Sequence, residues 1–381
     1  MTPKTRLMIP GPVDVEEDIL EALAQPVLPH YGKAWLEIYH ETVAGLKEVF
    51  GTQEELFMMA GPGTAALDAA LGSLTYTGDK VVVTHNGFFG RRLGTVAERY
   101  GLQVCPLEAP VGQAIDPEAL RQVLAREPGV QAVTVVHLET STGVLNPLRD
   151  LAAVANEFGV PIIADAVSSL GGVPLPVDEW GIDVCVTVIN KCLACPPGLA
   201  PLSVGRRAWE QIDRKGGRAH GWYLNLRVWK DYAVDWGDWH PYPTTLPTNL
   251  ILALRASLQR ILAQGLEAYY GRHVRAAQAT RDALWAMGFG LYTGEECTSP
   301  LITAVTGLPG MDVEDYRRYL MEQWGIMISG GLDDLRGKIF RVGHIGKAAS
   351  AEYVEAFLAG TEAYLRLQGR QVPAREKVAW A

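Results

Sequence analysis

AVTVVHLETSTGVLNPLRDLAAVANEFGVPIIADA, residues 132–166, contains two apolar runs on either side of a helical pattern. The runs 132–138 and 160–166 have the length of β-strands and are apolar nearly throughout, as expected of strands that are covered on both faces. Residues 147–159 between them have the spacing of an amphipathic helix, which ends at Gly159. The stretch therefore predicts a strand, a crossover helix and a parallel strand.

The same alternation extends in both directions along the chain. Further strands are predicted at 56–59, 80–84, 102–107, 183–188 and 200–205, and further helices at 64–74, 90–101 and 116–129. Asp116 followed by Pro117 is typical of a helix start. We therefore predict an α/β protein whose large domain has a mainly parallel, seven-stranded sheet covered by helices.

The pattern changes after residue 205. An aromatic stretch at 221–247 shows little periodicity and is either a packed loop or a wall of a substrate pocket, and one long helical pattern follows it to about 287. Strands at 300–305, 325–330 and 338–346, with helices near 312–323 and 350–367, predict a small C-terminal α/β domain. We expect a large domain at 21–265, a small domain at 266–381, and residues 1–20 packed against the small domain.

The composition excludes several classes of function. The net charge is −9 and the pI about 5.5, without a basic run, so neither nucleic acid nor a membrane is an expected partner. We see no membrane span and no apolar core of a signal peptide. The five cysteines are odd in number and scattered, which argues against a disulfide framework and for the reducing cytoplasm.

A turn with two glycines, MMAGPGTAALDAAL at 58–71, separates a predicted strand from a predicted helix. The backbone amides and the helix dipole at such a turn can bind phosphate, with Gly63 permitting close approach and Thr64 adding a hydroxyl; a plain tight turn is the alternative. The turn also fits the dinucleotide pattern G-x-G-x-x-A. We reject that interpretation because the next strand ends in VVVTHNG, without the acidic residue that binds ribose.

Two ionisable residues follow strands of the predicted sheet. Asp165 lies at the strand end where open α/β sheets bind ligands. A buried carboxylate there needs a partner, which can be a protonated pyridine nitrogen, an arginine or a helix N-terminus. Lys191 follows the strand 183–188, where a desolvated amine can form a Schiff base.

Cys192 and Cys195 follow this lysine with C-x-x-C spacing. The run Pro196-Pro197-Gly198 breaks the helix that a redox site requires, and no second pair of ligands completes a zinc site. We interpret both cysteines as small apolar residues that pack near a pocket, and we predict no metal.

Arg341 lies inside the otherwise apolar strand KIFRVGHIG at 338–346. Its guanidinium suits a substrate carboxylate in bidentate geometry, and an internal salt bridge is the alternative. His344 in the same strand is interpreted as a packing residue.

The order of phosphate turn, strand-end aspartate and a lysine 26 residues later resembles pyridoxal-phosphate enzymes of the aspartate aminotransferase fold, known as fold type I. The finer resemblance is to class V aminotransferases of the alanine–glyoxylate and serine–glyoxylate group. It is carried by PGPVDV, GPGTAALDAAL, HNGFFGRR, VHLETSTGVLNPL, ADAVSSLGGVPLPVDEWGIDV, NKCLACPPGLAPLSVG, HPYPTTLP and FRVGHIG, from about residue 8 to 350.

The resemblance implies a role for each matching position. Lys191 corresponds to the Schiff-base lysine of pyridoxal 5'-phosphate and Asp165 to the carboxylate on the pyridine nitrogen. The other implied cofactor contacts are Gly63 and Thr64 at the phosphate turn, Phe89 stacked on the ring, Thr140 near the phenolic oxygen, Val167 on the opposite ring face and Asn190 beside the phosphate.

The resemblance also implies a homodimer with shared active sites. Tyr242 and Thr245 correspond to residues that reach the phosphate from the partner subunit. Arg341 corresponds to the arginine that binds the substrate carboxylate, and Gly11 to the loop that lines this pocket. The implied reaction is a ping-pong transfer from a small amino acid, such as alanine or serine, to a small 2-oxo acid such as glyoxylate or pyruvate.

The departures from the family pattern leave alternatives. Pro62, Thr64 and Asn190 replace a frequent serine, histidine and glutamine, so the phosphate contacts are expected to be rearranged. The run NKCL also occurs in pyridoxamine–pyruvate aminotransferases, but that branch modifies the phosphate turn, which this chain keeps as GPGT. A cysteine desulfurase-like lyase needs a histidine at Asn190 and a nucleophilic cysteine, for which Cys297 is the candidate; a catalytically silent cofactor-binding protein is the last alternative.

Overall fold

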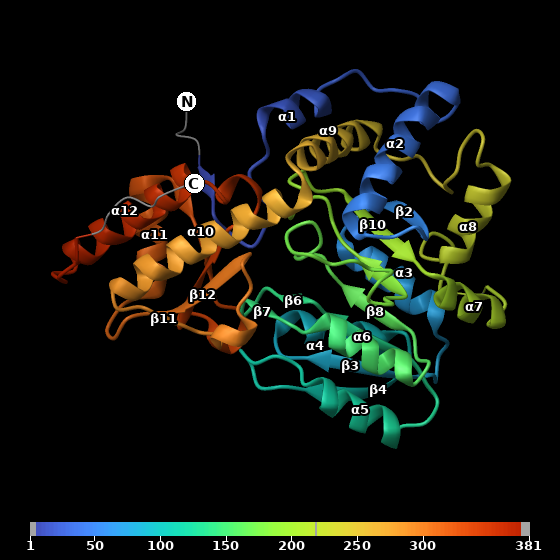
Figure 1. Ribbon diagram of the computed structural model, residues 1–381, viewed down its shortest axis with the longest axis horizontal. Coiled ribbons are helices and arrows are strands. Elements are labelled where there is room, and N and C mark those ends of the chain that lie inside the picture. The colour runs from blue at the N-terminus through green and yellow to red at the C-terminus, as the bar shows by residue number, and fades with distance from the viewer. Residues whose placement is uncertain (1–4, 218, 375–381) are drawn as a thin grey trace.

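Seven strands form the central sheet in the order β2-β10-β9-β8-β5-β3-β4 in the computed structural model, which describes residues 5–217 and 219–374 (Figure 1). The strands are β2 (Glu55–Ala60), β3 (Lys80–His85), β4 (Gln103–Glu108), β5 (Val130–Val136), β8 (Ile162–Asp165), β9 (Val184–Val186) and β10 (Leu199–Val204). Neighbouring strands from β9 to β4 are parallel, and β10 is antiparallel to both of its neighbours. The predicted mainly parallel, seven-stranded sheet is confirmed.

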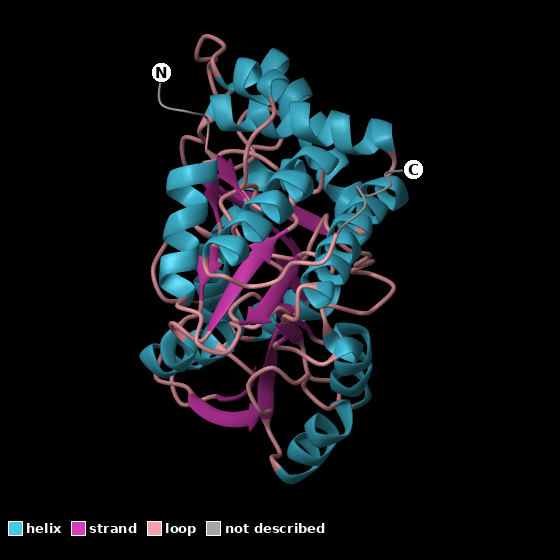
Figure 2. Ribbon diagram, turned by 90° about the vertical axis from the view of Figure 1, so that its left-hand side faces the viewer, coloured by secondary structure: helices cyan, strands magenta, loops and turns pink. Residues whose placement is uncertain are grey.

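Helices lie on both sides of this sheet (Figure 2). They include α2 (Lys33–Phe50), α3 (Gly63–Leu74), α4 (Phe88–Arg99), α5 (Pro117–Arg126) and α6 (Leu148–Glu157). The side chain of Asp116 accepts a hydrogen bond from the amide of Glu118 at 2.9 Å, so it caps α5 as its sequence predicts. Because apolar side chains from both layers cover them, the strands β5, β8 and β9 are buried along nearly their whole length.

The structure corrects the prediction for residues 206–287. Helices α7 (Arg206–Arg214) and α8 (Leu226–Asp235) were not predicted, and the long helical pattern is two helices, α9 (Thr248–Gln264) and α10 (Leu266–Ala286). Gly265 ends α9 with a φ of 84°, a left-handed conformation that glycine adopts at little cost. The aromatic stretch lacks a clear period in the sequence but contains α8, which the Asn225 side chain caps by accepting the Arg227 amide at 2.9 Å.

A smaller sheet with the order β11-β12-β15-β14 follows. Its strands are β11 (Gly290–Leu291), β12 (Ile302–Thr306), β14 (Ser329–Gly330) and β15 (Ile339–Gly343), and α11 (Val313–Trp324) and α12 (Ala351–Leu367) pack nearby. The predicted strand 325–330 is instead two short strands, β13 (Ile326–Met327) and β14. His344 is fully buried with Nε2 2.9 Å from Thr303 Oγ1, which confirms it as a packing residue.

The N-terminal segment packs against this smaller sheet, and its strand belongs to a separate two-stranded sheet. Strand β1 (Arg6–Leu7) pairs in parallel with β13, and the amide of Gly343 donates to the carbonyl of Met8 at 2.8 Å. Met8 is fully buried in the same apolar cluster as Phe340 and Phe357. Beyond residue 16, α1 (Glu17–Leu23) packs on α9 instead. The domain boundaries at 20 and 265 stay predictions, and residues 1–4 lie outside the described residues.

Over the residues that the structure describes, no helix is both long enough and apolar enough to cross a membrane.

Replacing Gly343 with alanine should detach the N-terminal segment. An added Cβ would lie 2.2 Å from the carbonyl oxygen of Ile9, a backbone atom that cannot rotate away. We expect a loss of about 1–3 kcal/mol in the free energy of unfolding and faster hydrogen exchange at residues 6–12. In the matched control, Gly290→Ala, the new Cβ meets no heavy atom within 4 Å and both quantities should stay unchanged. Equal behaviour of the two variants would contradict this packing.

Candidate active site

A cavity of about 470 Å³ lies where β5, β8 and β9 end. The site residues predicted from the sequence that line it are Gly63, Phe89, Thr140, Asp165, Val167, Asn190 and Lys191. They come from segments far apart in the chain, and the parallel register aligns Asp165 with Val136 and Val186 of the flanking strands. The cavity therefore occupies the position at which open α/β sheets bind ligands.

Asp165 is 4% exposed, and its Oδ1 accepts one hydrogen bond, from the amide of Val167 at 3.0 Å. Burial raises the pKa of this carboxyl to about 6, against the effects of the Val167 amide and Arg92. Among the described residues no lysine or arginine forms an ion pair with it. Because the structure provides so little compensation for its charge, Asp165 favours a cationic or N–H-bearing ligand.

Lys191 points its amine at the N-terminal segment. Its Nζ donates a hydrogen bond to the carbonyl of Pro10, and a Cβ at Gly11 would lie 2.4 Å from its Cδ. Gly11 has a φ of 122°, so both its conformation and the lack of space require glycine. Burial lowers the pKa of Lys191 to about 8, with Arg341 and Arg92 acting in the same direction and Asp165 opposing. The amine is thus much closer to its nucleophilic form at neutral pH than an ordinary lysine.

The N-terminus of α3 forms another wall of the cavity. Gly61, Pro62 and Gly63 line it, and a Cβ at Gly63 would lie 2.7 Å from Val167 and 2.8 Å from Val188. The main chain can therefore approach a ligand closely at the end of a helix where amides attract anions. Thr64 is the second residue of α3 and does not itself line the cavity.

Arg341 approaches the cavity through Thr140. It is 6% exposed, its Nε donates to the carbonyl of Gly330 at 2.8 Å, and its Nη1 donates to the carbonyl of Thr140 at 2.7 Å. Burial lowers its pKa to about 10. No salt bridge to Arg341 is formed within the described residues, so its charge is held by main-chain carbonyls, and the side chain stands next to a residue that lines the cavity.

Tyr242 and Thr245 lie outside the cavity of their own chain. Tyr242 is fully buried; its hydroxyl accepts from Trp35 Nε1 at 2.5 Å and donates to the carbonyl of His30. Thr245 is exposed, and its hydroxyl is 3.3 Å from His30 Nε2. The aromatic stretch does not line the cavity either. A contact from Tyr242 to a partner's phosphate requires the exchange of its present hydrogen bonds, whereas Thr245 is accessible as it stands.

The cysteines beside the lysine are packing residues. Cys192 and Cys195 are fully buried, and burial raises the pKa of each thiol to about 12. Their sulfurs donate to the carbonyls of Ser168 and Ala253 at 3.5 and 3.6 Å. Cys297 lies in the short helix Glu295–Cys297, buried and outside the cavity.

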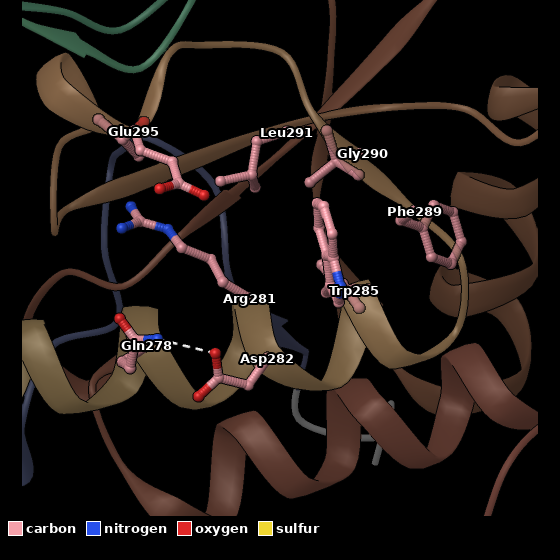
Figure 3. Close-up of a pocket in the computed structure, with 11 residues that line it drawn as sticks. Gln278, Arg281, Asp282, Trp285, Phe289, Gly290, Leu291 and Glu295 are labelled. Atoms are coloured by element: carbon pink, nitrogen blue, oxygen red, sulfur yellow. Dashed lines mark hydrogen bonds between the residues drawn. The ribbon is translucent and has the colours of Figure 1, made fainter.

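A second cavity, of about 400 Å³, lies beside α10 (Figure 3). Arg281 and Glu295 point toward one another across it (Figure 3). Three of its polar side chains already have partners in the chain, because Arg281 donates to Thr303 Oγ1 at 3.1 Å and to the carbonyl of Ser299, and Gln278 donates to Asp282 at 2.7 Å. None of the site residues predicted from the sequence lines it. We therefore assign the active site to the first cavity.

Sequence reasoning missed two residues of the site. Arg92 lines the cavity, with its guanidinium carbon 4.7 Å from the centroid of the Phe89 ring. Glu139 is fully buried next to Thr140 and accepts the first amides of α4. Both lie in stretches that carry the family resemblance, HNGFFGRR and VHLETSTG, but their contacts are non-local and so leave no periodic signal.

A partly buried lysine and a buried aspartate in one cavity at the carboxyl edge of such a sheet are typical of fold type I pyridoxal-phosphate enzymes. The chain belongs to the class V aminotransferase family, whose model matches residues 17–336. It is therefore a pyridoxal-phosphate-dependent transaminase.

Several known proteins resemble the chain over nearly its whole length. A protein of Methanocaldococcus jannaschii named uncharacterized aminotransferase is 38% identical over 97% of this chain and 94% of its own. One of a Synechococcus species, named the small subunit of a soluble hydrogenase, is 39% identical over 93% of this chain and 92% of its own. The (S)-ureidoglycine–glyoxylate transaminase of Bacillus subtilis is 33% identical over 96% of this chain and 91% of its own. Its crystal structure matches with a TM-score of 0.92 over 99% of this chain and 97% of that one.

The cavity fits pyridoxal phosphate. A protonated ring nitrogen would supply the partner that the Asp165 carboxylate lacks, and Lys191 would supply an amine for the aldehyde. The tight turn at Gly63 leaves main-chain amides at the N-terminus of α3 available to a phosphate. Phe89, Val167 and Val188 provide apolar walls for a ring.

Replacing Asp165 with asparagine should stabilise the apo-protein at high pH and leave it unchanged at low pH. The asparagine can still accept the Val167 amide but carries no charge. The pKa of Asp165 rises from 3.8 unfolded to about 6 folded, so the ionised carboxyl costs about 3 kcal/mol above pH 6 and nothing below pH 4. Thermal unfolding of apo-proteins at pH 8 and pH 4 measures this difference. The exposed control, Asp334→Asn, should show no pH-dependent difference, and a less stable Asp165→Asn apo-protein at pH 8 would contradict the account.

Proposed function

We propose that this transaminase transfers the amino group of a small amino acid, such as alanine or serine, to glyoxylate or pyruvate in a ping-pong reaction. The observation that carries the proposal is that Lys191 and Asp165 share one cavity and that Arg341 stands next to it. The named activity of the Bacillus subtilis relative, which uses glyoxylate, supports the acceptor. A cavity of about 470 Å³ that must also hold the cofactor favours small substrates.

Each residue has a definite task in this reaction. The bound cofactor supplies an aldehyde that takes up the amino group and a protonated ring that withdraws electrons. Asp165 keeps the proton on the ring nitrogen, because its own buried charge is stabilised only if that proton stays. With the cofactor bound, the Lys191 amine would act as the general base that accepts the proton from the substrate Cα. Arg341 holds the substrate carboxylate by bidentate hydrogen bonds and so sets the orientation of the Cα–H bond.

We further propose that the active enzyme is a homodimer in the reducing cytoplasm. Thr245 is exposed and lies outside the cavity of its own chain, so its predicted phosphate contact has to reach the partner's cavity. The five cysteines are free thiols in the structure, which suits a reducing compartment.

The alternatives have less support. A desulfurase-like lyase needs an accessible nucleophilic thiol, but Cys297 is 5% exposed and burial raises its pKa. A pyridoxamine–pyruvate enzyme is expected to have a modified phosphate turn, but this chain keeps Gly61 and Gly63. The hydrogenase name of the Synechococcus relative is not transferred, because no group of three or more His, Cys, Asp or Glu within the described ranges is arranged to hold a metal ion.

Replacing Lys191 with alanine should lower turnover by about 10²–10⁴-fold, the contribution of a positioned general base. The measurement is the spectral change of the bound cofactor with a panel of amino donors, followed by glyoxylate or pyruvate. Borohydride reduction of the wild type should attach the cofactor to Lys191 in peptide mapping, whereas the exposed control, Lys33→Ala, should behave as the wild type. A wild type that responds to no donor, or a label at another residue, would overturn the proposal.

Replacing Thr245 with alanine should weaken cofactor binding several-fold although Thr245 is remote from the cavity of its own chain. The reason is the loss of one hydroxyl at the partner's phosphate, which is worth about 1 kcal/mol. The matched control is its neighbour, Thr244→Ala. Equilibrium dialysis gives the dissociation constant and sedimentation equilibrium the subunit number. A monomer that keeps its cofactor fully would refute the shared site.

A further inference from the structure

The first turn of α4 is capped by residues that lie some fifty positions later in the sequence. Its N-cap residue, Gly87, has no side chain with which to satisfy the first amides of the helix. The amides of Phe89 and Gly90 instead donate to Glu139 Oε2 at 2.9 and 3.1 Å, and the amide of Phe88 donates to Ser141 Oγ at 3.1 Å. A Cβ at Gly87 would lie 2.5 Å from the Glu139 carboxyl carbon, so the glycine provides the space for this carboxylate.

Glu139 is surrounded by hydrogen-bond donors. Oε2 receives the two helix amides, while Oε1 receives the amide of Ser141 at 3.1 Å and the Ser141 hydroxyl. The residue is fully buried, and all four of these groups are donors, so the site requires an acceptor without hydrogens. A carboxylate meets this requirement, whereas an amide of the same shape brings an NH₂ group against at least one donor.

This carboxylate connects two parts of the cavity wall. The helix turn that it caps carries Phe89, whose ring lines the cavity. Glu139 itself belongs to β6 (Leu138–Glu139), which pairs with β7 (Val144–Leu145), and the next residue, Thr140, lines the cavity and accepts Arg341 Nη1 at 2.7 Å. Phe89, through the first turn of α4, and Arg341 are therefore both hydrogen-bonded to the main-chain segment 139–140 or its side chains.

We propose that Glu139 is a positioning residue that fixes Phe89 and Arg341 relative to one another, through the first turn of α4 and the carbonyl of Thr140. It touches neither substrate nor cofactor and acts through the residues that do. The role of Glu139 in positioning Arg341 for the substrate rests on the proposed function. Its role in positioning Phe89 requires only that the cavity binds pyridoxal phosphate. The negative charge of Glu139 also faces the Arg341 guanidinium, with which it interacts electrostatically.

The test is Glu139→Gln, with Asp116→Asn as matched control. Asp116 also caps a helix with its carboxylate, at 2.9 Å from the Glu118 amide of α5, but it is exposed and lies outside the cavity. We expect Glu139→Gln to raise both the cofactor dissociation constant and the KM of the amino donor by about tenfold, as substitutions behind directly contacting groups do. Hydrogen exchange at residues 88–93 of the apo-protein should also become faster. Asp116→Asn should change none of these three quantities.

A purely structural role of Glu139 predicts a different result. Glu139→Gln would then unfold at lower temperature while its cofactor affinity and KM stayed at wild-type values, and that result would overturn the proposal. If Glu139→Gln does not fold, the variant Ser141→Ala tests the proposal instead. It keeps the Glu139 carboxylate and removes the acceptor of the Phe88 amide. A rise of about two- to threefold in both constants supports the proposal, and unchanged constants overturn it. A wild type that binds cofactor but accepts no amino donor would refute the proposed function alone. Hydrogen exchange at residues 88–93 and the cofactor dissociation constant would still test the role of Glu139.

Discussion

The burial of two oppositely charged groups that do not form an ion pair governs this structure. Asp165 and Lys191 lie in one cavity, and in each case burial is the main cause of a shifted pKa, to about 6 and about 8. The charged forms of both groups are therefore costly in the apo-protein. In the proposed function, bound pyridoxal phosphate would relieve both costs, because a protonated ring nitrogen would pair with Asp165 and the Lys191 amine would be held by the aldehyde. The same features that strain the apo-protein select the cofactor and prepare it for reaction.

The fold produces this arrangement by bringing distant segments to one edge of a parallel sheet. Strand β8 delivers Asp165, and the segment after β9 delivers Lys191, because neighbouring parallel strands end on the same side. The N-terminal segment crosses from the smaller sheet and places the Pro10 carbonyl on the Lys191 amine, which only glycine at position 11 permits. The smaller sheet adds Arg341 from β15. The site thus depends on the contact between both sheets.

Much of the fold could be predicted from the sequence, and the exceptions have physical reasons. Six of the seven central strands are short, mostly apolar runs that are buried along most of their length, so their pattern is clear, whereas the edge strand β4 is largely exposed. Helix α8 was missed because its apolar residues are not confined to one buried face: Trp229 is buried but Val234 is 69% exposed, which obscures the helical period. The break at Gly265 was missed because apolar residues continue through it. A single glycine in the sequence does not reveal a left-handed φ.

Site residues could be predicted where an ionisable side chain directly follows an apolar strand. They were harder to predict where their role depends on tertiary contacts. Asp165 and Lys191 can be identified by their positions after apolar strands, and the family resemblance supplies Phe89, Thr140 and Arg341. Glu139 and Arg92 cannot be identified in this way, because their roles depend on tertiary contacts. Glu139 caps a helix that lies fifty residues earlier in the chain, and Arg92 lies over the Phe89 ring. The prediction for Tyr242 depends on a second subunit.

The ionisation of Lys191 tests the central claim most directly. The rate at which an amine-reactive reagent modifies Lys191 in the apo-protein, followed by peptide mass spectrometry across a pH series, gives its pKa. The expected midpoint for Lys191 is a pKa of about 8. A midpoint near the ordinary lysine value of 10.5 would contradict the claim that burial at the edge of the sheet prepares this amine for the cofactor.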